Sequence, residues 1–260
     1  MYNEEYPDLI LEGLMYDLSI VEEGFKEGVK NAFKKIIAFL ERIGNWFLKI
    51  FRKIAKLIPK KDIPEADLST VSVNNYDTTK INEFIKNCSY WLKEVDNILI
   101  DRKKVDCDDS VSLNKYFNKL NDFFIEEKNA PLISPSYRNN MRNALGIGRE
   151  KVKCTKEILN YIISSYEELK NTNINDSIRS YRNSFRDLND LIFEKSNDYD
   201  KVKDIAGTDK RIMIMCNNLM NVSYGILDAF FKDLSMINTV AKDENIKKQV
   251  DAGLSGYTTS

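Results

Sequence analysis

The densest group of side chains able to do chemistry in this chain is a run of cations. Between residues 24 and 61 there are 11 Lys and Arg but only two acids, Glu27 and Glu41, which gives a net charge of +9 in a protein whose formal net charge is -1. Clustered cations attract phosphate groups, nucleic acids and anionic membrane surfaces. The run is therefore predicted to bind an anionic partner.

The same stretch carries apolar residues at alternating spacings of 4 and 3, which keeps them on one side of a helix. They are Val29, Phe33, Ile36, Leu40, Ile43, Phe47, Ile50, Ile54 and Leu57, and the face is widened by Phe25, Phe39, Trp46 and Phe51. A face this broad needs a membrane surface, other helices, or both as its partner. The alternative is that the helix docks on its own chain and leaves its charges in water.

The residues predicted to bind a membrane or a protein partner combine the rings and the cations of this helix. They are Phe25, Lys34, Lys35, Phe39, Trp46, Phe47, Lys49, Phe51, Arg52, Lys53 and Lys56. Near an anionic leaflet each cation contributes about 1 kcal/mol, and each fully desolvated apolar side chain contributes roughly 1.5–3 kcal/mol. A handful of both would hold the chain on a surface reversibly.

Patterns typical of enzymes and metal sites are missing from the sequence. There is no His, which removes the commonest general base and the imidazole metal ligand. The four cysteines stand singly and are expected to be reduced, buried thiols. No nucleophile motif, Walker motif or pair of catalytic carboxylates is found. We therefore expect a protein that is not an enzyme and has no cofactor or metal, since an enzyme using Asp, Lys or Tyr would need a pocket of convergent ionisable groups.

Three weaker patterns have ordinary structural explanations. The G-I-G sequence at 146–148 resembles a phosphate-binding turn, but Lys151 replaces the third glycine, so a corner between helices is predicted. The acids between Asp106 and Asp109 are predicted to cap a helix, where they complement its dipole. A basic strip diluted by neighbouring acids is predicted to be a solvated mixed face, and it comprises Arg179, Arg182, Arg186 and Lys195.

The composition predicts an all-α fold, because 10 Gly and 5 Pro allow few of the turns that an all-β fold requires. The basic amphipathic helix should end before Pro59, which lacks an amide donor. We expect an acidic leader (1–23), the basic helix (24–61), a linker (62–75), an antiparallel bundle of about five helices (76–245) and a flexible tail (246–260). The bundle helices are predicted from Asp77 or Thr78 to about Leu99 and at about 110–128, 148–170, 176–196 and 208–241.

The N-terminal 23 residues contain seven acids and no Lys or Arg, so they do not resemble a signal peptide. They balance the basic helix, and by difference residues 62–260 have a net charge of -3. An acidic leader lying beside the helix would weaken its attraction for anionic surfaces. The longest uncharged run, 212–227, is too short and polar for a membrane span and is predicted to be a buried helix.

Three tetrapeptides before residue 67 resemble the cleavage signals of tailed-bacteriophage prohead proteases. These cut after Glu in an aliphatic-x-Glu context with a small residue next. The matches are Ile10-Leu11-Glu12 before Gly13, Val21-Glu22-Glu23 before Gly24, and Ile63-Pro64-Glu65 before Ala66, and the second has Val where Ile or Leu is usual.

This resemblance implies a non-catalytic phage structural or internal virion protein, packaged with scaffold-core proteins inside the capsid and trimmed during head maturation. Cutting after Glu23 would remove a charge of -7 and leave a body of +6, suited to packed DNA or a host membrane. Cutting after Glu65 would instead discard the basic helix as an assembly coil. The expected partners are virion or scaffold-core proteins, DNA or an anionic membrane, and self-association stays open. The alternative is a peripheral helical protein at the cytoplasmic membrane surface of a low-GC bacterium.

Overall fold

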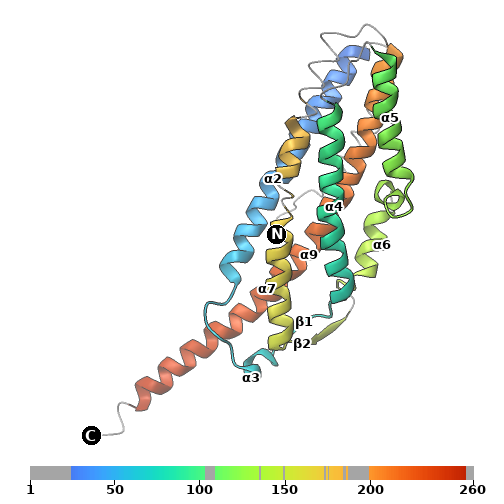
Figure 1. Ribbon diagram of the computed structural model, residues 1–260. Coiled ribbons are helices and arrows are strands. Elements are labelled where there is room, and N and C mark those ends of the chain that lie inside the picture. Colours follow the sequence, from blue (N-terminus) through green and yellow to red (C-terminus); the bar gives the residue numbers. More distant parts are fainter. Residues whose placement is uncertain are drawn as a thin grey trace. The chain divides into compact units, whose positions relative to one another are not determined.

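The computed structural model describes residues 25–102, 109–134, 136–148, 150–172, 174, 176–183, 186 and 199–255. This part of the chain is mostly helical, at 79%, with one small two-stranded sheet (Figure 1). The predicted helical class is therefore confirmed. The predicted acidic leader lies outside the described residues, and so do the predicted cleavage signals at Glu12–Gly13 and Glu23–Gly24.

The chain divides into two compact units, each assembled from three segments. The first unit comprises Met1–Phe47, Ser89–Tyr137 and Asn173–Leu219, and the second comprises Leu48–Cys88, Arg138–Thr172 and Met220–Ser260. Three long helices contribute residues to both units: α2 (Phe25–Leu57), α4 (Thr78–Arg102) and α9 (Tyr199–Ser255).

Helix α2 ends just before Pro59, as predicted, because proline disfavours α geometry in the residue before it. The Ile58 N–H still donates to the Ile54 carbonyl at 3.2 Å. Over the residues whose side chains are described, the apolar stripe is buried at Leu40, Phe47, Ile50, Phe51 and Ile54, and its last residue, Leu57, is half-buried. The 4 and 3 spacing of the sequence thus corresponds to a buried face.

The first unit also contains α5 (Ser110–Ile125), the 3-10 helix η1 (Ala130–Ile133) and helical residues 176–183. Asp109 caps α5, accepting hydrogen bonds from the amides of Val111 at 3.0 Å and Ser112 at 3.2 Å, so its predicted capping role is confirmed. The face of α5 that is buried repeats every three or four residues: Leu113, Tyr116, Leu120, Phe123 and Phe124.

A buried asparagine fixes the chain that follows α5. The Asn129 side chain accepts a hydrogen bond from the Trp91 indole at 2.9 Å and donates to the Phe123 carbonyl at 2.8 Å. Asn218 donates in the same way to the Leu132 carbonyl at 2.8 Å. These amides satisfy backbone carbonyls that would otherwise be buried without partners.

The second unit contains α3 (Glu65–Leu68), β1 (Ser72–Asn74), nearly all of α6 (Tyr137–Ala144), β2 (Lys151–Lys153) and α7 (Lys156–Asn171). The strands lie side by side and are antiparallel (Figure 1), with Ser72 opposite Lys153, Val73 opposite Val152 and Asn74 opposite Lys151. Val73 is fully buried, so this short sheet belongs to the core of the unit.

The structure corrects several predicted boundaries. The predicted linker segment contains α3 and β1, and the helix predicted from Gly148 starts only at Lys156, where Thr155 caps it by accepting from the Ile158 amide at 3.2 Å. The last helix, α9, is longer at both ends than the 208–241 segment predicted for it. Strands of three residues are too short to show a period-2 pattern, which is why the sequence did not reveal them.

The cysteines that the structure describes agree with the sequence interpretation. Cys88, Cys154 and Cys216 are buried, reduced thiols. Burial raises the pKa of Cys88 to about 12, because a thiolate is poorly solvated inside the protein. Such thiols pack as small apolar residues.

Candidate functional site

The outer face of α2 carries the predicted cations. Lys34, Lys35, Lys49, Arg52, Lys53 and Lys56 are all exposed, and so are Lys60 and Lys61 just beyond the helix. We call the set in the second unit, Lys49, Arg52, Lys53, Lys56, Lys60 and Lys61, the cationic face. No acid lies between residues 48 and 61. Within the part of the chain that the structure describes, none of these six side chains makes an ion pair.

The described aromatic side chains of α2 are buried or half-buried. Phe47 and Phe51 are 1% and 7% exposed, so in this structure they are core residues and not the surface anchors that the sequence suggested. The Phe51 ring lies 5.8 Å from the Tyr166 ring, and the Tyr166 hydroxyl donates to the Phe51 carbonyl at 3.0 Å. Trp46 is half-buried. The side chains of Phe25 and Phe39 lie outside the described part.

The apolar face of α2 is therefore covered by its own chain over the described residues, because burial of these rings is favourable. The cations remain in water. Lys53 lies over the Phe231 ring at 5.7 Å, a contact that keeps its charge at the surface.

The third cleavage signal lies in a folded segment. Glu65 and Ala66 are exposed but form the first turn of α3, and the Glu65 carboxylate accepts a hydrogen bond from the Lys156 amide at 3.1 Å. Ile63, two residues before Glu65, is 6% exposed. A protease that needs an extended substrate would have to unfold this turn first.

The weaker sequence patterns have structural roles. Gly146 and Gly148 adopt positive φ angles of 72° and 79° in the turn that leads from α6 to β2, so the predicted corner joins a helix to a strand. Arg182 pairs with Glu41 at 3.6 Å, and Arg179 and Arg186 are exposed.

No pattern in the sequence indicates the buried carboxylate of Asp233, on α9. Its side chain is fully buried, and one oxygen accepts hydrogen bonds from the Asn74 amide at 2.8 Å, the Asn74 side chain at 2.9 Å and the Tyr76 hydroxyl at 2.5 Å. The other oxygen lies 3.3 Å from the Lys151 ammonium. A buried carboxylate needs such partners, and here β1, β2 and Tyr76, two residues after β1, supply them.

This network determines the electrostatics of its neighbours. Burial, and next the negative charge of Asp233, raise the pKa of the Tyr76 phenol far above its ordinary value, so Tyr76 stays a hydrogen-bond donor. Burial and the same carboxylate raise the pKa of Cys154 to about 11. A sequence pattern relates residues that are close along the chain, whereas the partners of Asp233 lie 82, 157 and 159 residues away, so the sequence did not reveal this site.

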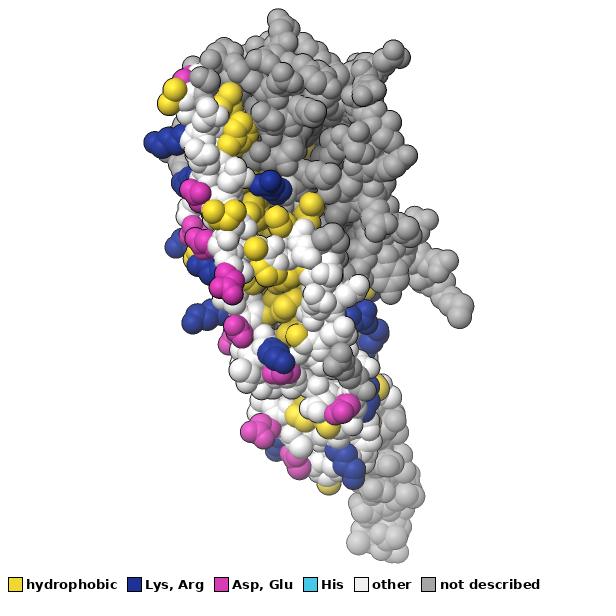
Figure 2. All heavy atoms as spheres, turned by 90° about the vertical axis from the view of Figure 1, so that its right-hand side faces the viewer, with side chains coloured by type: hydrophobic (Ala, Val, Ile, Leu, Met, Phe, Trp, Pro, Cys, Tyr) yellow, Lys and Arg dark blue, Asp and Glu magenta, His cyan; other side chains and the backbone are white. Residues whose placement is uncertain are grey.

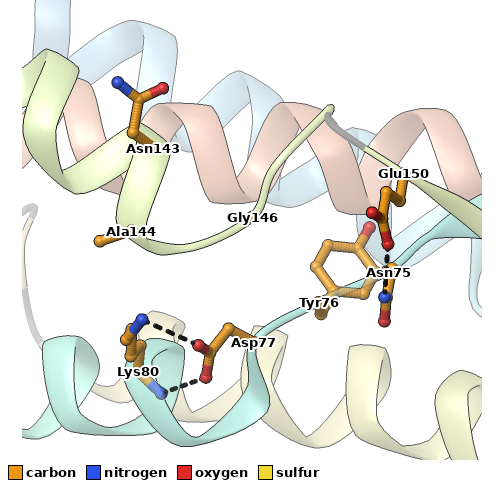
Figure 3. A pocket seen from close by; sticks show the side chains of 8 residues that line it. All are labelled: Asn75, Tyr76, Asp77, Lys80, Asn143, Ala144, Gly146 and Glu150. Atoms are coloured by element: carbon orange, nitrogen blue, oxygen red, sulfur yellow. Dashed lines mark hydrogen bonds and ion pairs between the residues drawn. The ribbon is translucent and has the colours of Figure 1, made fainter.

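Two hollows adjoin each other at Asn75 and Tyr76. The first, which we call the α6 hollow, has a volume of about 670 Å³ and is bounded by the start of α4, the end of α6 and Glu150 (Figure 3). The second, the α7 hollow, has a volume of about 410 Å³ and is lined by Thr78, Asn82, Glu157 and Tyr161 together with the shared residues.

The face drawn in Figure 2 has mixed charge. Lys and Arg side chains lie among Asp and Glu side chains along its margin, while apolar side chains gather toward the middle. Opposite charges at such separations largely cancel, so the field there is weak. The cationic face of α2 differs because its charges are of one sign.

Comparisons with known proteins found no matching family model, no similar curated protein and no similar solved structure. Among the described residues, no helix has the length and apolar character needed to cross a membrane. In the same part of the chain, no three Cys, Asp or Glu side chains are grouped as metal ligands.

Replacing Asp233 tests its structural role. Asp233→Ala is expected to lower the free energy of unfolding by roughly 3–5 kcal/mol, because it leaves buried donors without an acceptor. Asp228→Ala is the matched control on the same helix, since it removes only a surface pair with Lys232 and should cost about 0.3–0.5 kcal/mol. Urea denaturation measures both. Equal losses would contradict the role, and if Asp233→Ala does not fold, Asp233→Asn is compared instead.

The raised pKa of Tyr76 predicts alkaline destabilisation. The phenol stays protonated in the folded protein but ionises near pH 10 when unfolded, so its stabilising contribution is complete below about pH 10 and is lost as pH rises further. The free energy of unfolding should fall by up to about 1.4 kcal/mol per pH unit from this residue. Urea unfolding at a series of pH values gives the free energy of unfolding as a function of pH. Above pH 10 this free energy should fall less steeply with pH in Tyr76→Phe than in the unmodified chain, by that amount. Identical pH slopes for the two proteins would contradict the assignment.

Proposed function

We propose that this protein is a non-catalytic structural or internal component of a bacteriophage virion that binds a polyanion, most simply packed DNA, through the cationic face of α2. It would act inside the capsid, alongside virion or scaffold-core proteins. The observation that carries the proposal is the exposure of six cations between Lys49 and Lys61 with no described acidic partner.

The spacing of the cations suits a phosphate backbone. Lys49, Arg52, Lys53 and Lys56 follow the 3 and 4 spacing of one helix face, and at 1.5 Å per residue Lys49 and Lys56 are separated by about 10 Å along the axis. Cations that have no acidic neighbour release counterions when they contact phosphates, which favours binding. Lys60 and Lys61 extend the same charge beyond the helix end.

The burial of the rings favours a polyanion over a membrane. Insertion into a bilayer interface requires exposed apolar side chains next to the cations. Phe47 and Phe51 are buried. Beside the cations of the second unit, Leu48 is the large apolar side chain that is exposed, at 44%, among the described residues of the 48–61 segment. The peripheral membrane alternative would require α2 to separate from its core. Binding by charge alone needs no such change.

A non-catalytic role fits the ionisable groups of the two hollows. The ammonium of Lys80 pairs with Asp77 at 3.2 Å, and the Tyr161 hydroxyl lies 3.4 Å from the Thr78 carbonyl. The Tyr76 hydroxyl donates to the Asp233 carboxylate, but burial, and next the charge of Asp233, raise the pKa of this phenol, so it is held as a hydrogen-bond donor. An activated nucleophile needs the opposite, a group that readily gives up its proton.

We propose processing after Glu12 or Glu23 with retention of α2. Within the first unit Gly44 of α2 lies near Ile178, and within the second unit Phe51 of α2 lies near Tyr166. Cutting after Glu65 would uncover these apolar surfaces. The assembly-coil alternative is therefore less favourable energetically.

We further propose that the helices form an antiparallel bundle. In the first unit, Gly44 lies near Ile178 while Glu41 pairs with Arg182, so the two segments run in opposite directions. Trp91 likewise reaches Asn129, beyond the end of α5.

The DNA proposal predicts a charge-dependent affinity. Full-length protein should bind a fluorescent duplex with an affinity that falls as salt rises from about 50 to about 200 mM. The variant combining Lys49→Gln, Arg52→Gln and Lys56→Gln should reduce the slope of log K against log salt by about 2.7, because each lost phosphate contact contributes about 0.9.

A matched variant removes three exposed lysines elsewhere: Lys86→Gln, Lys93→Gln and Lys115→Gln. It should leave the salt slope close to that of the unmodified chain. Equal slopes for the two triple variants would contradict the proposal. Salt-sensitive binding to phosphatidylserine vesicles with no binding to DNA would favour the membrane alternative.

The processing proposal predicts a new N-terminus. Mass spectrometry of the protein recovered from its native particle should find Gly13 or Gly24 as the first residue. Met1 would contradict processing altogether. Ala66 would show processing but contradict retention of α2.

A further inference from the structure

The two hollows of the second unit form a preformed polar cleft that the cationic face of α2 does not include. Its walls are fixed by backbone hydrogen bonds, from the Asn75 amide to Glu150 at 3.0 Å and from the Asp77 amide to Leu145 at 3.4 Å. At Gly146, where φ is positive, an added Cβ would lie 3.2 Å from the Asn75 carbonyl oxygen. A side chain there would push the walls apart, so the close approach depends on glycine.

Tyr76 forms the partition between the hollows and cannot swing away. Its hydroxyl is held by Asp233, and its ring lies 5.3 Å from Phe230 and 6.3 Å from Tyr161. A rigid cleft loses little conformational entropy when it binds a small molecule.

The cleft is acidic. Its described lining includes the carboxylates of Asp77, Glu150 and Glu157 and a single cation, Lys80. That cation is neutralised locally, because the Asp77 side chain accepts from both the Lys80 ammonium at 3.2 Å and the Lys80 amide at 3.1 Å. Figure 3 shows this pair at one end of the α6 hollow and Glu150, with Asn75, at the other.

The helix ends contribute partial charges of both signs, because the starts of α4 and α7, which carry partial positive charge, also border the hollows. Helix α6 ends at Ala144, so its C-terminal end, which carries partial negative charge, borders the same hollow as Glu150. The hydrogen bond from Asn75 to Glu150 is long, at 3.4 Å, and leaves that carboxylate open to a stronger donor. The negative sign of the cleft therefore depends on its side chains, chiefly on Glu150 and Glu157, because Asp77 and Lys80 pair with each other.

We propose that the two hollows together bind an aliphatic polyamine, with one ammonium group in each hollow and the methylene chain passing across Asn75 and Tyr76. In the α6 hollow the ammonium donates to Glu150 and to the side-chain oxygen of Asn143. In the α7 hollow the second ammonium donates to Glu157, close to the Tyr161 ring, which attracts cations. This site is separate from the cationic face of α2, so it stands whether or not that face binds DNA.

Isothermal titration calorimetry of the full chain with putrescine and spermidine tests the site. Saturable binding of one molecule per chain is expected, and butylamine, with a single ammonium, should bind at least about tenfold more weakly than putrescine. Glu150→Gln and Glu157→Gln should each weaken putrescine binding by about tenfold or more. Both residues are exposed, and circular dichroism checks that each variant stays folded.

Glu127→Gln is the matched control, because Glu127 is exposed and belongs to the first unit. It should bind putrescine as the unmodified chain does. The proposal is overturned if putrescine does not saturate, if butylamine binds equally well, or if the three Gln variants behave alike. Binding of inorganic phosphate at the cleft would also overturn it, since an anion would show that the field there is not negative.

Discussion

The second unit is organised around one buried carboxylate. Asp233 is fully removed from water, and a charge in that position is tolerated only when donors surround it. Those donors come from Asn74, Tyr76 and Lys151, so α9 is tied to β1 and β2 at one point. Holding Tyr76 in place also fixes the partition of the polar cleft. The buried carboxylate thus positions one residue of the cleft, while backbone hydrogen bonds of Asn75 and Asp77 hold its walls.

Helix α2 obeys a second constraint, which is that its broad apolar face has to be covered. Over the described residues the chain covers that face itself, with Phe47 and Phe51 in the interior. Once the rings are buried, the opposite side of the helix faces water, and in the second unit it carries Lys49, Arg52, Lys53 and Lys56 together with Leu48 and Ala55. The uniform positive charge of the surface thus follows from the packing of the opposite side. It favours partners recognised by charge and disfavours those that need inserted rings.

The acidic cleft and the cationic face give the second unit two surfaces of opposite sign. A cationic surface close to a polyanion attracts it from a distance comparable to the Debye length, about 10 Å at moderate salt. The carboxylates of the acidic cleft would instead attract small cations. On the face drawn in Figure 2, by contrast, Lys and Arg side chains lie among Asp and Glu side chains along the margin.

The sequence by itself determined α2: its register, its end before Pro59 and the separation of apolar from cationic residues, all of which are set by neighbours three or four positions apart. It also predicted the capping role of Asp109 and the buried thiols. It could not reveal the pairing of β1 with β2, because strands of three residues carry no period, nor the network of Asp233, whose partners Asn74 and Tyr76 lie 159 and 157 residues away. Whether Phe47 and Phe51 face a partner or their own core was likewise decided only by tertiary packing, since an amphipathic pattern states that a face must be buried but not against what.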